Sequence, residues 1–217
     1  KLFTMRELKE ALKNNWEGYE NIRTLCLKAP KYGNDDDYVD EIVSDLYKAW
    51  VKTLSNTYTI LGKSFKPAAI SITSQWLGGA ITGATPDGRK AGEVLADGGA
   101  SPMRGRDVRG PTAVIKSASK IDQTCLQSVL LNMKFHPSAL KSVEDMKKLS
   151  ILIKTYFRLG GKHIQFNVID KNTLIEAQKH PEYYKDLIVR VAGFSAYFVQ
   201  LSKEVQDEII ARTEHCI

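Results

Sequence analysis

Cysteine is scarce in this 217-residue chain, which has three: Cys26, Cys125 and Cys216. An odd count without CxxC spacing argues against a disulfide framework and predicts reduced thiols. The four histidines are widely scattered and are His136, His163, His180 and His215. None lies three or four residues from another His or Cys, so we assign no metal ligand and expect no structural metal site.

Long hydrophobic runs are also absent. No apolar segment approaches the roughly 18 to 20 residues that span a bilayer, and the first twenty residues have a polar, helical pattern unlike that of a signal peptide. We therefore expect no membrane partner and a cytoplasmic location. The chain begins at Lys1 instead of Met, which indicates processing or truncation of a longer protein, and truncation is the favoured interpretation.

The charge is only mildly one-sided, because 31 Lys and Arg residues oppose 25 Asp and Glu residues and give a net charge of +6. The one dense basic patch, Arg104, Arg106 and Arg109, includes Asp107 and has no interleaved aromatic residues. This pattern does not favour a nucleic-acid partner, and we expect none. A hydrophobic content of 43% is enough for one globular core.

Helical signals occur early in the chain. Residues 4–7 have the pattern of a capping box, and the apolar residues that follow at four-residue spacing are Leu8, Leu12 and Trp16. A second helix is predicted after three aspartates at 35–37, with a buried stripe made of Val39, Ile42, Val43, Leu46 and Trp50. We interpret the aspartates as its N-terminal cap. A metal-binding loop is the alternative, although the Gly and terminal Glu of a calcium loop are missing.

The rest of the chain alternates between predicted strands and helices. Strands are expected at residues 68–74, 130–135, 163–169 and 187–191, the third with alternating Ile164, Phe166 and Val168. Helices are expected after Pro111, over residues 142–157, from Thr173 to Pro181 and over residues 202–213. The apolar face of the helix at 142–157 consists of Met146, Leu149, Ile153 and Phe157. This alternation predicts an α/β fold with parallel neighbouring strands.

A lone glycine follows the last predicted strand, in the segment RVAGFSAYF at residues 190–198. Periodicity alone makes Gly193 a turn residue, because glycine adopts positive φ at little cost. A sharper interpretation explains why the residue is glycine. A radical on an α-carbon is flattened and delocalised between the flanking amide nitrogen and carbonyl group. A side chain would crowd that geometry and block another protein's access to the Cα hydrogen.

This segment resembles the radical motif of the glycyl radical enzymes, and ATPDGRKAG at 84–92 with LADGGASP at 95–102 resembles their companion motif. Similar segments cover essentially the whole chain: GPTA at 110–113, SASKID at 117–122, NMKFHP at 132–137, HIQFN at 163–167 and QDEII at 206–210. The run from Ser195 to Phe198 is more similar to the branch of dehydratases, carbon–nitrogen lyases and decarboxylases, often named pyruvate formate-lyase 2, than to pyruvate formate-lyase proper. Phe194 stands where Tyr is more usual, and we expect its ring to serve as a packing element.

The resemblance implies a fold. Glycyl radical enzymes are built on a ten-stranded α/β barrel made of two antiparallel five-stranded halves, and this chain would supply its C-terminal part. Residues 1–75 would form helices and a strand of the C-terminal half-barrel. Residues 76–217 would form the glycyl radical domain, with the glycyl radical loop and a closing C-terminal helix. The glycine-rich stretch at 78–110 lacks the pattern of a phosphate-binding loop and would order the base of this domain.

The resemblance also implies a radical relay. A separate iron–sulfur, S-adenosylmethionine-dependent activase would remove a hydrogen from Gly193, and the chain itself would bind no cofactor. The peptide that the activase would recognise comprises Arg190, Val191, Ala192, Phe194, Ser195 and Ala196. In the family the radical then moves to a cysteine in a Gly-Cys-X-Glu loop on the preceding part of the polypeptide. None of the three cysteines matches that loop. We expect Cys26 and Cys125 to be small buried side chains and Cys216 a tail residue, and the chain alone to be inactive.

The same resemblance gives expectations for ligands and partners. Thr73 is the candidate substrate contact, with packing of the barrel wall as the alternative. The substrate would be a small molecule such as a diol, choline, hydroxyproline, an arylacetate or a sulfonate, and the whole enzyme would be a homodimer. Three functions fit: the C-terminal part of a lyase, a stand-alone glycyl radical spare part that restores an oxygen-cleaved partner enzyme, and a non-enzymatic binding domain with a decayed motif.

Overall fold

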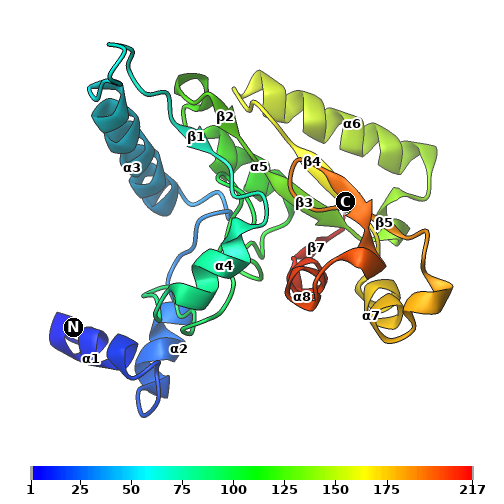
Figure 1. Cartoon of the computed structure of the whole chain (residues 1–217), viewed down its shortest axis with the longest axis horizontal. Helices are drawn as coiled ribbons and strands as arrows, with labels where there is room; N and C mark the ends of the chain where they lie inside the picture. The colour runs from blue at the N-terminus through cyan, green and yellow to red at the C-terminus, as the bar shows by residue number, and fades with distance from the viewer. Residues whose placement is uncertain (1, 217) are drawn as a thin grey trace.

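Short strands flanked by longer helices make up the structure, a computed structural model that describes residues 2–216 (Figure 1). The α-helices are α1 (Met5–Lys13), α2 (Glu20–Lys28), α3 (Asp37–Ser55), α4 (Ser74–Ile81), α5 (Pro111–Ser119), α6 (Val143–Arg158), α7 (Lys171–Lys179) and α8 (Lys203–Ala211). The strands are β1 (Ala68–Ala69), β2 (Ser128–Val129), β3 (Asn132–Phe135), β4 (Gln165–Val168), β5 (Ile188–Arg190), β6 (Ser195–Tyr197) and β7 (Glu214–His215).

Parallel pairing dominates the strands. The central sheet has the order β4-β3-β7, and both pairs are parallel, with Asn132 opposite Gln165 and Phe135 opposite His215. Strands β1 and β2 form a second parallel pair, and β5 and β6 form an antiparallel hairpin. The predicted α/β class with parallel neighbours is confirmed. The division of the chain near residue 75 stays a prediction.

Three hydrophobic clusters stabilise these elements. The largest joins α5 and α6 to the β2–β3 region, and α6 crosses the upper edge of the sheet in Figure 1. A second cluster packs α7 and α8 against β5, at the lower right of the figure. The third holds α1 and α2 together at the lower left, where the indole of Trp16 is buried. The second cluster supports the turn that follows β5.

Several helix boundaries agree with the sequence signals. Thr4 and Glu7 form the capping box of α1, and α5 has Pro111 at its start. Helix α1 ends at Lys13, so Trp16 lies in the following turn, with φ of +72°. Helix α7 begins earlier than predicted, because the side chain of Asp170 accepts the N-terminal hydrogen bond. Across residues 2–216, no helix combines the length and the apolar character needed to cross a membrane.

The predicted strand at 68–74 is largely wrong. Only Ala68 and Ala69 pair with β2; Ile72 then has φ of +46°, and the backbone N–H of Ser74 donates to the carbonyl oxygen of Ser71 at 2.8 Å. These contacts turn the chain into α4, which overrides the strand preference of the β-branched residues. Thr73 therefore lies directly before a helix and not in a barrel strand.

The predicted buried stripe of α3 is also wrong in part. Ile42, Leu46 and Trp50 are exposed, whereas Val43 packs partly against the main cluster. Polar residues face inward instead: the Ser44 hydroxyl donates to the carbonyl oxygen of Lys120 at 2.9 Å. Lys120 also pairs with the carboxylates of the buried Asp40, of Asp35 and of the exposed Asp37. The aspartates therefore bind a lysine, and the cap residue Asp36 makes no side-chain cap hydrogen bond.

Two further predicted faces differ from the structure. In α6 the exposed residues include Met146 and Phe157, and the fully buried ones are Leu152 and Tyr156. In β4 the apolar Val168 is exposed, while the intervening Gln165 and Asn167 are buried. The reason in β4 is hydrogen bonding, because both amide side chains hold the β5–β6 hairpin.

Candidate radical site

Gly193 lies at the tip of the β5–β6 hairpin. Arg190 pairs with Ser195, and the backbone N–H of Val191 donates to the carbonyl oxygen of Phe194 at 2.9 Å, which leaves Ala192 and Gly193 to make the turn. Gly193 has φ of +79°, in the left-handed region that favours glycine. A Cβ added there would meet no atom within 4 Å apart from its chain neighbours. The backbone conformation, and not lack of space, therefore requires glycine.

The turn has a buried base and an exposed tip. Val191 and Ala192 are buried in the region of the second hydrophobic cluster, whereas Gly193, Phe194 and Ser195 are exposed. The predicted packing role of Phe194 is only partly met, because its side chain is 39% exposed in the described chain. The buried Val191 and Ala192 therefore anchor the turn in the fold, and the Cα of Gly193 remains accessible.

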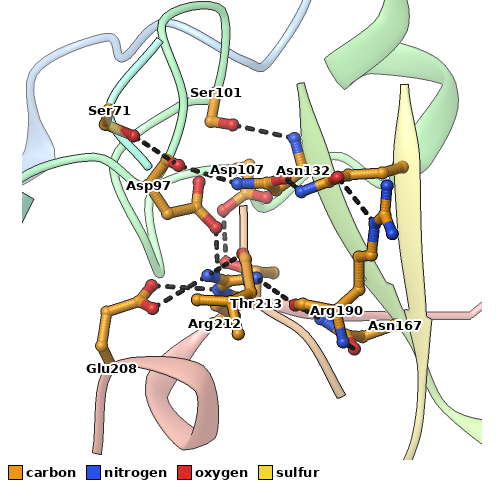
Figure 2. A network of polar contacts seen from close by, with 12 residues as sticks. Ser71, Asp97, Ser101, Asp107, Asn132, Asn167, Arg190, Glu208, Arg212 and Thr213 are labelled. Carbon is orange, nitrogen blue, oxygen red and sulfur yellow. Dashed lines mark hydrogen bonds and ion pairs between the residues drawn. The ribbon is translucent and has the colours of Figure 1, made fainter. Parts of the chain in front are cut away.

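Two amide side chains of β4 hold the turn directly. The Gln165 Oε1 atom accepts hydrogen bonds from the backbone N–H of Gly193 and from Nε of Arg190, both at 3.0 Å. Asn167 binds both backbone polar groups of Arg190: its Oδ1 accepts from the N–H at 2.7 Å and its Nδ2 donates to the carbonyl oxygen at 2.6 Å. Asn167 therefore acts as an additional strand partner for β5 (Figure 2).

A second layer of polar contacts supports Gln165. Its Nε2 donates to Oδ1 of Asn132, whose own Nδ2 donates to the carbonyl oxygen of Asp97 at 2.7 Å. The same carbonyl accepts from the hydroxyl of Ser71 at 2.8 Å, and the Ser101 hydroxyl accepts from the backbone N–H of Asn132 at 3.0 Å (Figure 2). The glycine-rich stretch is thus connected to the Gly193 turn through β3 and β4. This connection supports the prediction that the stretch orders the base of the domain.

Arg212, just after α8, contacts the base of the turn from the other side. Its Nη2 donates to the carbonyl oxygen of Val191 at 2.8 Å, and its Nη1 donates to that of Arg190 at 3.3 Å. The guanidinium also pairs with carboxylate oxygens of Asp97 and Glu208, each at 2.9 Å (Figure 2). Two backbone carbonyls and two carboxylates therefore converge on one buried cation.

Burial sets the electrostatics of this cluster. It raises the pKa of Asp97 to about 6, because desolvation and the Glu208 carboxylate outweigh the attraction of Arg212. Burial alone would lower the pKa of Arg212, but Asp97 and Glu208 raise it, so the cation is retained. The neighbouring cavity, lined in part by Asp97, Asn132 and Arg212, has a volume of about 20 Å³. That is room for about one water molecule and not for an organic substrate.

The structure brings the predicted activase motif together as one hairpin. Arg190 donates from Nη1 to the hydroxyl of Ser195 at 3.2 Å, across the two strands, and Ala196 pairs with Val189. Thr73 is not part of this network, and its neighbour Ser71 joins the network instead. Thr73 as a substrate contact stays a prediction.

The cysteines are separate from the turn. Apart from its chain neighbours, no atom lies within 4 Å of the position that a Cβ on Gly193 would occupy, so none of the three described thiols lies that close to it. Cys26 is buried, as predicted, but Cys125 is exposed, so its predicted burial is wrong. The Cys125 thiol donates to Asp122 at 3.0 Å, and this contact raises the pKa of the thiol. Among residues 2–216, no cluster of three or more His, Cys, Asp or Glu side chains is arranged to hold a metal ion.

Sequence reasoning gave no site role to most of this network, which includes Asp97, Asn132, Gln165, Asn167, Glu208 and Arg212, although the first five of these lie in segments that resemble the family. A signal was present in β4, where amide side chains alternate with apolar ones in a strand that pairs with β3. Buried polar groups need hydrogen-bond partners, so buried amides that alternate along an edge strand such as β4 indicate that another backbone segment is bound there. The contribution of Arg212 could not be found this way, because its partners lie 21 to 115 residues away, apart from Glu208.

Comparisons with known proteins support the resemblance. The family model described as glycine radical matches residues 96–199, and the model described as pyruvate formate lyase-like matches residues 1–79. The chain is 46% identical to trans-4-hydroxy-L-proline dehydratase from Clostridioides difficile over 99% of its length, and 48% identical to indoleacetate decarboxylase from Tractidigestivibacter scatoligenes over 91%. It covers 27% and 22% of these two relatives, so it spans about a quarter of their length.

Solved structures agree with this assignment. The glycerol-bound form of the B12-independent glycerol dehydratase from Clostridium butyricum superposes with a TM-score of 0.96 at 48% identity, over 99% of this chain and 27% of that one. A glycyl radical enzyme from Archaeoglobus fulgidus gives a TM-score of 0.93 at 38% identity, over 99% of this chain and 28% of that one. The chain therefore belongs to the glycyl radical enzyme family, and its helices and strands form part of that family's α/β barrel.

Proposed function

We propose that this chain is the radical-storing portion of a glycyl radical lyase and that Gly193 carries the radical. The observation that carries the proposal is the state of Gly193: it sits at an exposed turn tip, with positive φ, a hydrogen-bonded N–H and open space around its Cα. An activating protein needs access to a Cα hydrogen, and the turn provides it. The segment from Arg190 to Ala196 would be the peptide that a separate S-adenosylmethionine and iron–sulfur activase recognises.

The proposed relay consists of hydrogen-atom transfers. Activation breaks one Cα–H bond of Gly193 and leaves an unpaired electron on the carbon. A cysteine thiol then gives one hydrogen atom to that carbon, which reforms the C–H bond, breaks the S–H bond and leaves a thiyl radical. That cysteine would lie on another portion of the enzyme, because none of Cys26, Cys125 and Cys216 lies within 4 Å of the position that a Cβ on Gly193 would occupy. The chain alone would therefore be inactive.

The substrate class follows from what the relatives share. Their names include a dehydratase of hydroxyproline and a decarboxylase of indoleacetate, so the cleaved bonds differ while the family is common. We extend to this chain only the shared chemistry, which is radical cleavage of a C–O, C–N or C–C bond in a small organic molecule. A preceding portion of the polypeptide, an activase and a second copy of the whole enzyme would be its partners.

Electron paramagnetic resonance tests the radical assignment. The protein, together with the portion that carries the catalytic cysteine, is incubated anaerobically with its activase and reductant. We expect a doublet from the remaining α-hydrogen, and we expect it to collapse to a singlet when the protein contains glycine deuterated at Cα. Gly193→Ala removes the signal. Gly160→Ala is the matched control, because Gly160 also has positive φ, at +96°, and also has open space around an added Cβ. A doublet that persists in Gly193→Ala contradicts the assignment.

A further inference from the structure

Gln165 makes an unusual set of contacts for a buried strand residue. It is 7% exposed and lies opposite Asn132 in the central sheet, and its carboxamide contacts both the turn and the neighbouring strand. Its oxygen accepts from the Gly193 N–H and from Arg190 Nε at 3.0 Å each, and its nitrogen donates to the Asn132 oxygen. Arg190 and Asn132 are each held by further hydrogen bonds, and these contacts restrict the position of the carboxamide.

The orientation of the carboxamide follows from its partners. Its oxygen faces two N–H donors, and its NH₂ group faces an acceptor oxygen of Asn132. The amide group of Asn132 is itself oriented, because its Nδ2 donates to the Asp97 carbonyl at 2.7 Å. A flipped Gln165 would place its NH₂ group against two other donors, which would leave buried polar groups without partners. The acceptor atom therefore always faces Gly193.

The chemistry of an α-carbon radical gives this hydrogen bond a second role. When Gly193 loses a hydrogen atom, the nitrogen lone pair is shared with the electron-deficient carbon, and the N–H becomes more positive. A hydrogen bond to a more positive donor is stronger. The Gln165 oxygen therefore binds the radical state more strongly than the resting glycine, and only such a difference shifts the balance between two states.

We infer that Gln165 is a positioning residue that tunes the Gly193 radical, by holding its N–H and stabilising the radical relative to the thiyl state. The inference rests on the proposed function, in which Gly193 carries the radical. No proton or electron passes through Gln165, and the hydrogen atom moves only between the Gly193 carbon and a thiol. Since the contact is made at nitrogen and the space around Cα is open, Gln165 stabilises the radical without blocking its carbon.

Three variants separate this role from ordinary support of the turn. Gln165→Met has a similar size and no acceptor oxygen, while Gln165→Glu keeps an acceptor. Asn167→Leu is the matched structural control, because Asn167 holds the backbone of Arg190 at 2.6 and 2.7 Å and its hydrogen bonds do not include the Gly193 N–H. Each variant is prepared with the portion that carries the catalytic cysteine, labelled with ¹⁵N-glycine and activated anaerobically.

Two readouts report on the radical itself. Electron–nuclear double resonance measures the ¹⁵N hyperfine coupling of Gly193, and the decay of the radical signal with added 2-mercaptoethanol measures its resistance to hydrogen transfer from a thiol. In Gln165→Met we expect a shifted coupling and a half-life about two- to tenfold shorter, because a more positive donor roughly doubles the strength of an ordinary hydrogen bond and only that increase is lost. Gln165→Glu restores the half-life to within about twofold, and Asn167→Leu keeps the unsubstituted coupling.

The outcomes distinguish the two levels of the proposal. If the unsubstituted protein gives a radical that Gly193→Ala abolishes, but Gln165→Met has the same coupling and half-life, the inference about Gln165 is wrong and the radical site stands. A signal that does not depend on Gly193 overturns the proposed function. Equal changes in Gln165→Met and Asn167→Leu would show a structural role only and would also overturn the inference.

Discussion

The Gly193 turn and the Gly88 turn invite comparison, because each lies in a segment that resembles a family motif and each has a glycine with positive φ, at +79° and +96°. Their surroundings are opposite. A Cβ on Gly88 would lie 2.5 Å from Leu27 Cδ2, whereas a Cβ on Gly193 would meet nothing within 4 Å. Gly88 is required by conformation and by packing together, and Gly193 by conformation alone. The first turn joins two parts of the fold, and the second presents a backbone carbon.

An arginine holds each turn, and the two arginines differ in their partners. Arg89, 1% exposed, donates to the carbonyl oxygens of Thr82 and Gly83 and to the Thr85 hydroxyl, the first of these at 3.1 Å. Its own carbonyl oxygen accepts from the indole of Trp16 at 2.9 Å. Arg212 also binds backbone carbonyls, but it pairs with two carboxylates as well. The Gly88 turn is held by an arginine with neutral acceptors, and the Gly193 turn is held by an arginine that belongs to a charged cluster.

The largest expected effect tests that difference in partners. Arg212→Met should lower the free energy of unfolding by about 3–5 kcal/mol, because it leaves the buried Asp97 and Glu208 carboxylates without their cation. Arg89→Met should cost about 2–3 kcal/mol, since it leaves only neutral acceptors unsatisfied. Urea denaturation followed by circular dichroism measures both values.

The control for Arg212→Met adds Asp97→Asn and Glu208→Gln. Removing the two charges should recover part of the lost stability, because neutral amides tolerate burial better than unpaired carboxylates. An Arg89→Met variant that is as unstable as Arg212→Met, or a triple variant without recovery, would show that charge does not distinguish the two turns.

The pH dependence of stability also tests whether a charged cluster holds the Gly193 turn. The pKa of Asp97 is raised to about 6 in the folded chain, from its ordinary value of 3.8. Between about pH 4 and pH 6 the folded state therefore holds a proton that the unfolded state releases, so this group makes the fold less stable as pH rises. The total loss across the window is on the order of 2–3 kcal/mol.

Asp97→Asn isolates this contribution, because asparagine does not titrate. The unfolding free energy of the unsubstituted protein minus that of Asp97→Asn should fall between about pH 4 and pH 6 and be flat above pH 7. Urea denaturation at constant ionic strength measures this difference. A difference that rises with pH would mean that Arg212 controls the carboxyl group and lowers its pKa.

Much of the fold could be predicted from local signals. The capping box at Thr4, the proline start of α5 and the strand before Gly193 follow from residues close in sequence, and the structure confirms them. Predictions failed where distant partners decide the outcome. The exposed Leu46 of α3 follows a helical apolar spacing, but the inner face is set by polar contacts such as that of Ser44 with Lys120, 76 residues away.

The same limit applies to the site. Gly193 is singled out by the sequence because the proposed chemistry requires a particular residue type within a short motif, and its radical role stays a prediction. The alternating amides of β4 indicate that Gln165 binds another segment, but they do not name its partner, and Arg212 has no such local signal; only the fold shows which backbone groups these two side chains bind. A motif therefore names a candidate atom, while the residues that hold it are found only in three dimensions.

The smallest expected effect is the difference in stability between alanine variants of the two glycines. Gly88→Ala combines an unfavourable φ with the overlap on Leu27 and should lower the free energy of unfolding by about 2–4 kcal/mol. Gly193→Ala meets only the φ penalty and should cost about 1–2 kcal/mol. Urea denaturation of the two variants should thus rank Gly88→Ala as the less stable by about 1–2 kcal/mol, while only Gly193→Ala loses the radical signal. If Gly193→Ala is the less stable variant, the turn is constrained by packing and the open space around its carbon does not explain its chemistry.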